Sequence, residues 1–142
     1  MAIRQAEARW DGSLQEGSGR TTGQSGAFDV PFSFKTRFGD EPGTNPEELI
    51  GAAHAGCYSM ALSGDLGRAG FTPDYVNTTA KVHFGPVDGK PTISKIELVV
   101  SASVPGIEDG QFQEIAAGTK ENCPISRALG AVSEIVVSAT LA

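Results

Sequence analysis

Two cysteines are the residues of this chain with the most distinctive chemistry. Cys57 and Cys123 are its only cysteines, and they stand 66 positions apart in the sequence. This spacing fits neither a C-x-x-C redox motif nor a zinc site. A thiol of ordinary pKa, about 8.5, is only about 3% thiolate at pH 7. Either cysteine is therefore an activated thiol, which needs help from its surroundings, or a buried structural residue.

Two arginines are candidates for activating a thiol. A fixed guanidinium beside a cysteine can raise the thiolate fraction roughly thirtyfold. Arg37 precedes a Gly-Pro loop, and Arg20 lies in a glycine-rich turn region. Either could be the partner of a cysteine, and a solvated surface position is the alternative for each.

Glu47 is a further candidate for a role beside a thiol. It occupies the first turn of a predicted helix, where negative charge also favours the helix dipole. It precedes Cys57 by ten positions, or roughly 15 Å of helix rise. Glu47 therefore cannot touch Cys57 of the same straight helix. If it serves that thiol, it must come from another copy of the chain.

The two histidines allow a different chemistry. His54 lies one turn before Cys57 on the same helix face, so it could act as the base of a Cys-His hydrolase or acyl transferase. A packed, hydrogen-bonded histidine is the alternative. His83 falls on the polar face of a predicted strand, where exposure is expected. Because the two are far apart in the sequence, we expect no metal site. We also expect no bound cofactor.

A long helix must position Cys57. Asn45 suits the N-cap, Pro46 suits the first helical position, and Gly70 suits the C′ position of a helix that ends near Ala69. Small residues surround the middle of this helix, from Gly51 to Cys57. Such a helix is predicted to be buried and closely approached by its neighbours.

The remaining segments alternate between strands and helices. Period-two patterns predict strands, and Asp88-Gly89 predicts a hairpin turn between two of them. The predicted strands cover residues 6–10, 32–34, 76–84, 96–104 and 135–141. Two further helices are expected over residues 109–122 and 124–129, with Cys123 at the N-cap of the second. The order indicates an α+β fold of antiparallel sheets and segregated helices, forming one domain over residues 1–142.

Composition excludes several classes of protein. The chain has 142 residues, a net charge of −6 and 39% hydrophobic residues, which fits one domain with a core. The acidic balance argues against nonspecific nucleic-acid binding. No apolar stretch reaches the roughly 20 residues that a bilayer requires, and the first residues turn polar at once. We therefore expect a cytoplasmic protein without a membrane segment, in which a disulfide would be transient.

Several motifs together resemble the OsmC/Ohr family, which comprises osmotically inducible protein C and the organic hydroperoxide resistance proteins. The likeness is closer to the OsmC branch, through the Thr-Arg-Phe triplet and the Gly-Ala-Ala-His-Ala helix. The matching blocks are Thr36-Arg37-Phe38, the run from Gly43 to Leu62, Phe71-Thr72-Pro73, Val104-Pro105-Gly106-Ile107 and Cys123-Pro124-Ile125-Ser126.

The resemblance implies a thiol peroxidase on an intertwined homodimer, with antiparallel sheets packed around a long central helix. Such a peroxidase reduces organic hydroperoxides, and hydrogen peroxide more weakly, in stress defence. By family role, Cys57 matches the peroxidatic cysteine and Cys123 the resolving one, so the two would form a disulfide. Glu47 matches a glutamate that works with an arginine. In the OsmC branch that arginine falls at the position of Arg37, which is the choice favoured here. In the Ohr branch it comes from the early strand loop, where Arg20 lies. A thiol or lipoyl-type compound is the implied reductant.

Apolar residues near the thiol would favour organic hydroperoxides, and the chain offers Tyr58, Met60 and Phe38 for this role. Two other functions stay open at this point. One is the Cys57-His54 acyl transferase or hydrolase. The other is a nonenzymatic stress-binding module with two inert thiols.

Overall fold

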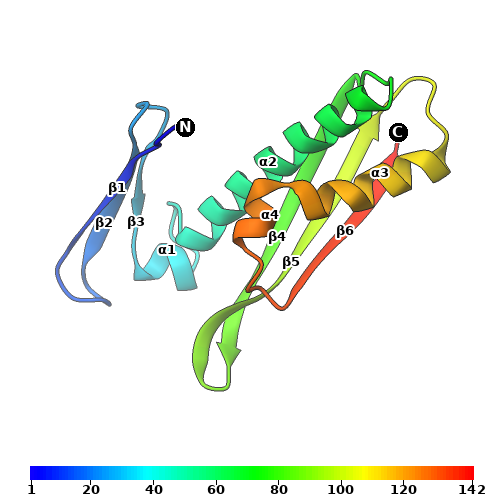
Figure 1. The fold of residues 1–142 in the computed structure, drawn as a ribbon. Helices are drawn as coiled ribbons and strands as arrows, with labels where there is room; N and C mark the ends of the chain where they lie inside the picture. The colour runs from blue at the N-terminus through cyan, green and yellow to red at the C-terminus, as the bar shows by residue number, and fades with distance from the viewer. The chain divides into compact units, whose positions relative to one another are not determined.

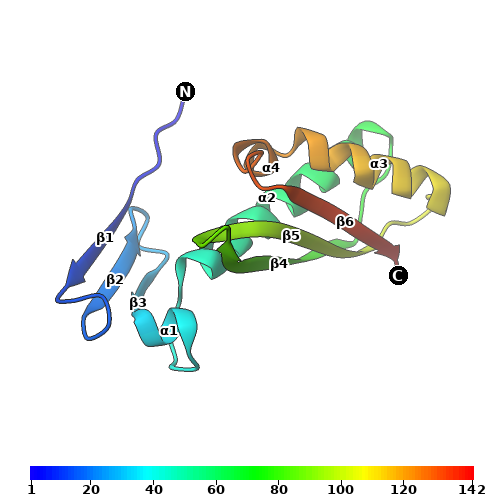
Figure 2. The ribbon, with the colours of Figure 1, turned by 90° about the horizontal axis from the view of Figure 1, so that it is seen from below.

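The computed structural model describes residues 1–142, and its backbone divides into two compact units, residues 1–49 and 50–142. Figures 1 and 2 show the helices and strands of each unit. None of its helices is long and apolar enough to cross a membrane. The expectation of a single domain over residues 1–142 stays a prediction.

The first unit is built on a small antiparallel sheet. Its strands are β1 (Ala6–Asp11), β2 (Ser18–Gly23) and β3 (Asp29–Phe32), in the spatial order β1-β2-β3. None of the fully buried hydrophobic side chains comes from this unit, and Leu14 and Phe38 are largely exposed. The unit therefore has no apolar core of its own.

A short helix follows where the sequence predicted more strand. The alternation of Phe32 and Phe34 suggested a continuing strand, but β3 ends at Phe32 and α1 spans Phe34–Phe38. The reason is a capping box. The Ser33 hydroxyl accepts from the Thr36 N–H at 3.1 Å, and the Thr36 hydroxyl accepts from the Ser33 N–H at 2.8 Å. Local capping thus overrides the period of two and places Arg37 on a helix.

The long helix forms as predicted. α2 spans Pro46–Arg68, and the Asn45 side-chain oxygen accepts from the Glu48 N–H at 2.8 Å. Gly70 follows the helix with a φ of 93°, the left-handed conformation that favours glycine after a helix end.

The second unit contains a mixed sheet. β4 (Tyr75–Val87) and β5 (Lys90–Ser103) form the predicted antiparallel hairpin, in which Asp88 and Gly89 have φ values of 50° and 76°. β6 (Glu134–Leu141) pairs with β5 in parallel, which corrects the expectation of purely antiparallel sheets. A parallel pair needs a long crossover. α3 (Asp109–Asn122) and α4 (Pro124–Ala128) lie in that connection.

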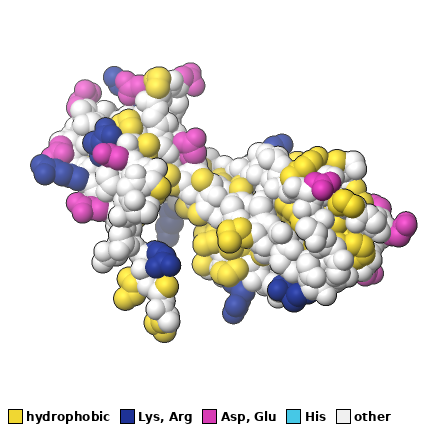
Figure 3. All heavy atoms as spheres, turned by 90° about the horizontal axis from the view of Figure 1, so that it is seen from above, with side chains coloured by type: hydrophobic (Ala, Val, Ile, Leu, Met, Phe, Trp, Pro, Cys, Tyr) yellow, Lys and Arg dark blue, Asp and Glu magenta, His cyan; other side chains and the backbone are white.

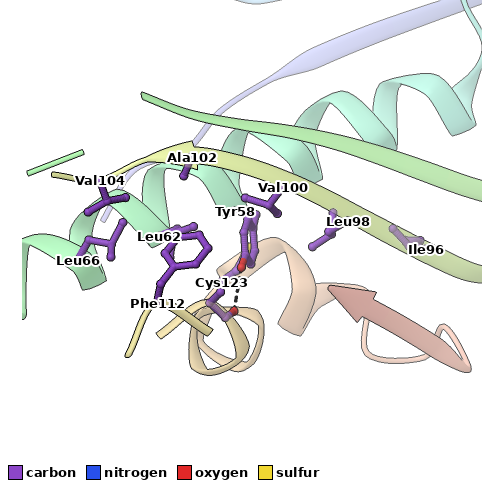
Figure 4. Close-up of a cluster of buried hydrophobic side chains, with 11 residues drawn as sticks. Tyr58, Leu62, Leu66, Ile96, Leu98, Val100, Ala102, Val104, Phe112 and Cys123 are labelled. Carbon is purple, nitrogen blue, oxygen red and sulfur yellow. Dashed lines mark hydrogen bonds between the residues drawn. The ribbon is translucent and has the colours of Figure 1, made fainter. Parts of the chain in front are cut away.

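The core of the second unit lies between its sheet and its helices. The inward side chains of β5 pack against α2 and α3, and Figure 4 shows this cluster. The fully or nearly fully buried members are Tyr58, Leu62, Leu66, Ile96, Leu98, Val100, Ala102, Val104, Phe112, Ala116 and Cys123. One of the two cysteines is therefore part of the core. Hydrophobic patches also reach the surface of this unit, as one face of it shows (Figure 3).

Candidate active site

The fold of residues 50–142 brings the two cysteines together. Cys57 lies in the middle of α2, and Cys123 is the N-cap residue of α4. Their Sγ atoms are 3.1 Å apart, within hydrogen-bond distance, and both thiols are free. Cys123 is fully buried and Cys57 is partly exposed. The two sulfurs would need to move only slightly closer together to form a disulfide bond.

The surroundings of Cys123 favour its thiolate. Burial raises the pKa of Cys123, but hydrogen bonds from the Ser126 N–H, the Cys57 thiol, the Ser126 hydroxyl and the Ile125 N–H together outweigh it. The pKa of Cys123 is therefore lowered overall. The N–H groups at the start of α4 thus favour the thiolate of Cys123.

Cys57 has the opposite shift. Burial raises the pKa of Cys57 and outweighs the hydrogen bond from the Ile125 N–H, and the neighbouring Cys123 raises it further. No cation of residues 50–142 is among the groups that shift this thiol. Within this unit Cys57 therefore stays protonated near neutral pH.

The first unit holds a guanidinium–carboxylate pair. Arg37 Nε donates to both oxygens of Glu47, at 3.2 and 3.1 Å, and Arg37 Nη2 donates to Glu47 Oε1 at 2.5 Å. The Glu47 side chain is 11% exposed and that of Arg37 is 35% exposed. Three charge-assisted hydrogen bonds fix the plane of the guanidinium.

Arg20, the other candidate arginine, has a different partner. Arg20 Nε donates to Asp29 Oδ1 at 2.8 Å, and Nη2 donates to the carbonyl of Asp29 at 3.0 Å. Both side chains are more than half exposed. The glutamate that sequence analysis singled out therefore pairs with Arg37 and not with Arg20.

A mostly apolar cavity of about 380 Å³ adjoins Arg37 within the first unit. Phe38, one of the three apolar residues expected near the thiol, is among its lining residues. The lining comprises Trp10, Gly12, Leu14, Phe32, Ser33, Phe34, Arg37, Phe38 and Pro46. A hydrocarbon group of a small ligand fits such a surface.

The other two apolar candidates lie in different surroundings. Tyr58 is fully buried, and its hydroxyl donates to the carbonyl of Ala116 at 2.8 Å, the dashed line in Figure 4. Tyr58 is thus a core residue beside Cys123. Met60 is 79% exposed and lines an open cavity of about 420 Å³ with Tyr75.

His54 does not serve Cys57 as a base in this arrangement. It is fully buried on α2, and its Nε2 lies 2.6 Å from the hydroxyl of Ser126 on α4. Burial lowers the pKa of His54, so the ring is neutral at pH 7. Its Nδ1 has no hydrogen-bond partner. The geometry therefore favours the packed, hydrogen-bonded alternative over the Cys-His hydrolase. His83 is half exposed on the sheet and bonds Glu97, as a surface position predicts.

Ser126 is the residue of this site that sequence analysis did not single out. It is 6% exposed, and its hydroxyl lies 2.6 Å from His54 Nε2. Its N–H and its hydroxyl are also among the groups that lower the pKa of Cys123. The sequence did contain a signal. A serine three residues after an N-cap cysteine lies in the first turn of the same helix, within reach of the cap sulfur.

Comparisons with known proteins show the family and the fold of this chain. Residues 39–138 match the family model described as OsmC-like protein. The chain is 47% identical over 129 residues to Peroxiredoxin OsmC of Escherichia coli, and the match covers 90% of each chain. Among solved structures, an OsmC-like protein of unknown function from Vibrio cholerae superposes with a TM-score of 0.79 at 17% identity, covering 99% of this chain and 100% of the other. An organic hydroperoxide resistance protein of Bacillus subtilis gives a TM-score of 0.73 at 24% identity, covering 97% and 98%.

Proposed function

Since this chain belongs to the OsmC family, we propose that it is a cysteine peroxidase that reduces organic hydroperoxides, and hydrogen peroxide more weakly. The relative from Escherichia coli, 47% identical, carries the name peroxiredoxin, which supports a peroxidase-type oxidoreductase. The observation that carries the proposal is the distance of 3.1 Å between Cys57 Sγ and Cys123 Sγ.

The proposed reaction uses both sulfurs in turn. The Cys57 thiolate attacks the distal oxygen of the hydroperoxide, the O–O bond breaks, and the alkoxide leaves as an alcohol after taking a proton. Cys57 is then a sulfenic acid. The Cys123 thiolate attacks the sulfenic sulfur, the S–O bond breaks, and the hydroxide takes a proton to become water. Two thiols and one hydroperoxide thus give one disulfide, one alcohol and one water.

Activation of Cys57 is assigned to Arg37, held in place by Glu47. Cys57 needs a cation because burial raises its pKa, and the Arg37 guanidinium is held by Glu47 on a side chain that is partly exposed. Glu47 and Cys57 stand ten residues apart on one continuous helix, roughly 15 Å along its axis. The separation is no obstacle if the Arg37–Glu47 pair of one copy lies beside Cys57 of a second copy. The site is therefore proposed to form in a homodimer.

The lack of an apolar core in residues 1–49 supports such an assembly. A three-stranded sheet with no fully buried hydrophobic side chain gains its stability by covering its apolar surface with other parts of a protein. A second copy is the partner proposed here. Both units would then belong to the one domain that the sequence predicted.

The apolar lining beside Arg37 supports an organic substrate. A hydroperoxide would place its polar oxygens toward the guanidinium and its hydrocarbon group against the phenylalanines of the cavity. The disulfide would be reduced by exchange with an external thiol or lipoyl-type dithiol. A cytoplasmic location suits this chemistry, since that compartment supplies such reductants.

One mass measurement tests the proposal. The reduced protein receives one equivalent of cumene hydroperoxide, and we expect it to lose two hydrogen atoms and yield a linked Cys57–Cys123 peptide. Cys57→Ser is expected to abolish turnover of the hydroperoxide. Near-normal turnover by Cys57→Ser would reject Cys57 as the attacking thiol. An unchanged mass in the parent protein would reject the peroxidase and leave the inert-thiol binding module.

A further inference from the structure

A buried polar chain runs from His54 to Cys123. His54 Nε2 lies 2.6 Å from Ser126 Oγ. The Ser126 side chain is also among the hydrogen-bonding groups that lower the pKa of Cys123, the N-cap residue of the same helix. His54 is fully buried and Ser126 is 6% exposed, so water does not compete for these bonds. The proposed peroxidase chemistry, as stated above, uses neither residue.

The position of the proton on the His54 ring determines the direction of the hydrogen bonds from His54 through Ser126 to Cys123. A neutral imidazole carries one N–H. Nδ1 has no partner, so a proton there would be a buried donor without an acceptor. A proton on Nε2 instead donates to Ser126 Oγ, because that oxygen lies within hydrogen-bond distance. We therefore assign the proton to Nε2.

This assignment fixes the direction of the next hydrogen bond. With its oxygen accepting from His54, the Ser126 hydroxyl directs its own proton onward to Cys123 Sγ. A hydrogen bond donated to a sulfur stabilises its thiolate over its thiol. We propose that His54 is a positioning residue that acts through Ser126 to hold Cys123 as the thiolate that resolves the Cys57 sulfenic acid.

The inference rests on the proposed peroxidase function and adds a role for two residues in its second step. That step forms the S–S bond from the Cys123 thiolate and releases hydroxide from Cys57, so it is fast only when Cys123 is ionised. His54 and Ser126 do not touch the hydroperoxide in this proposal. Formation of the sulfenic acid is therefore expected to be independent of both.

Other titratable groups near Cys123 are few. Cys57 faces it from α2 and donates to its sulfur. Tyr58 faces it from the same helix, and Asp65 in turn faces Tyr58. Tyr58 stays neutral, because burial raises its pKa far above its ordinary value and the charges of Cys123 and Asp65 raise it further. The side chains of β5 in this core are apolar.

The test separates the two steps of the reaction in a protein without external reductant. One equivalent of cumene hydroperoxide is added in a quenched-flow instrument. Sulfenic acid at Cys57 is trapped with dimedone, and the Cys57–Cys123 disulfide is measured by mass. The variants are Ser126→Ala, Ser126→Thr, His54→Phe and the double variant His54→Phe/Ser126→Ala. Thr119→Val is the matched control, because Thr119 is a buried hydroxyl on α3 that bonds Asp65 and not a cysteine.

We expect Ser126→Ala to slow disulfide formation about tenfold near pH 7, the effect of one lost hydrogen bond to a charged group. Sulfenic acid formation should be unchanged, and raising the pH should restore the rate. His54→Phe keeps a ring at this buried position and should also slow disulfide formation. Ser126→Thr keeps the hydroxyl, so its rate of disulfide formation should stay near that of the parent protein. The double variant should be no slower than Ser126→Ala, because His54 acts through the hydroxyl. Thr119→Val should change neither step.

Two results would overturn the inference. One is a normal rate of disulfide formation in Ser126→Ala. The other is a His54→Phe effect that adds in full to that of Ser126→Ala, which indicates a merely structural role. A second readout needs no peroxide: the ultraviolet absorbance of the thiolate should titrate at higher pH in Ser126→Ala and His54→Phe. If the parent protein forms no sulfenic acid, the proposed function fails, while this titration still decides whether His54 and Ser126 stabilise the Cys123 thiolate.

Discussion

Glu47 accepts three hydrogen bonds from the guanidinium of Arg37, ten positions earlier in the chain. α1 ends just beyond the arginine, and α2 begins just before the glutamate. The loop between the two helices therefore determines how the two side chains are placed relative to each other. A hydrogen bond from the Thr36 hydroxyl to the Thr44 carbonyl, at 2.7 Å, closes this loop beside the pair. The geometry of the Arg37–Glu47 pair therefore depends on the conformation of this loop as well as on the hydrogen bonds between the two side chains.

Removal of the charge of Arg37 should cost activity through the thiol. We expect Arg37→Gln to lower kcat/KM for cumene hydroperoxide roughly thirtyfold at pH 7, because an unassisted thiol is only about 3% ionised there. The loss should shrink as the pH rises toward the pKa of the thiol. Steady-state rates across a pH series measure this dependence.

Arg20→Gln is the matched comparison, since Arg20 bonds Asp29 instead of Glu47. We expect its kcat/KM to stay near that of the parent protein. A large loss in Arg20→Gln with none in Arg37→Gln would transfer the activating role to Arg20. Glu47→Gln should give a smaller loss than Arg37→Gln, because it loosens the guanidinium without removing its charge.

The sequence predicted the long helix and both later helices because their ends carry local signals. Asn45, Pro46 and Gly70 act within one or two turns of the chain, so no tertiary information is needed to place them. α3 lies within the bounds predicted for it, Asp109–Asn122, for the same reason. Local chemistry thus determined most of the elements that carry the site.

Two features depended on information that the sequence pattern does not hold. The parallel pairing of β6 with β5 follows from the crossover through α3 and α4, and a strand's own residues do not encode its direction relative to a neighbour. The contact of His54 with Ser126 joins positions 72 residues apart, which only the tertiary fold brings together. The family resemblance did point to Cys57 and Cys123 as a pair, and their distance supports it.

An ion-pair cluster on the outer face of the sheet should make stability depend on pH. His83 Nε2 lies 2.5 Å from Glu97 Oε2, and this hydrogen bond, followed by the charges of Lys95, His83 and Lys81, lowers the pKa of Glu97 below its ordinary value of 4.5. A carboxylate with a lowered pKa stabilises the folded state above its unfolded pKa, and the contribution is lost as the pH falls through the folded pKa.

Glu97→Gln tests this dependence. We expect the variant to have a lower urea midpoint than the parent protein near neutral pH, with the difference closing at a pH well below 4.5. High salt should also reduce the difference, because both side chains are partly exposed. A difference that stays constant from neutral to acidic pH would contradict a role for the Glu97 charge.

The Tyr58 hydroxyl should contribute to stability. It donates to the carbonyl of Ala116 across the space between α2 and α3, and the side chain is fully buried. Tyr58→Phe leaves a buried carbonyl without this partner, so we expect the free energy of unfolding to fall by about 1–3 kcal/mol in urea titrations. Met60→Ala on the exposed face of the same helix should stay within about 0.5 kcal/mol. Equal effects of the two substitutions would contradict this account of the core.

The order of the two sulfurs in the proposed reaction can be read from a variant that stops it halfway. Cys123→Ser replaces the fully buried thiol with a hydroxyl, which is no longer a nucleophile toward a sulfenic acid. With one equivalent of hydroperoxide we expect Cys57 to gain one oxygen atom and to react with dimedone. Excess hydroperoxide should add a second oxygen, because no disulfide protects the sulfenic acid from further oxidation. Mass spectrometry of the Cys57 peptide measures both products. An unmodified Cys57 peptide, together with oxidation of Cys123 in the Cys57→Ser variant, would instead assign the first attack to Cys123, the thiol whose pKa is lowered within residues 50–142.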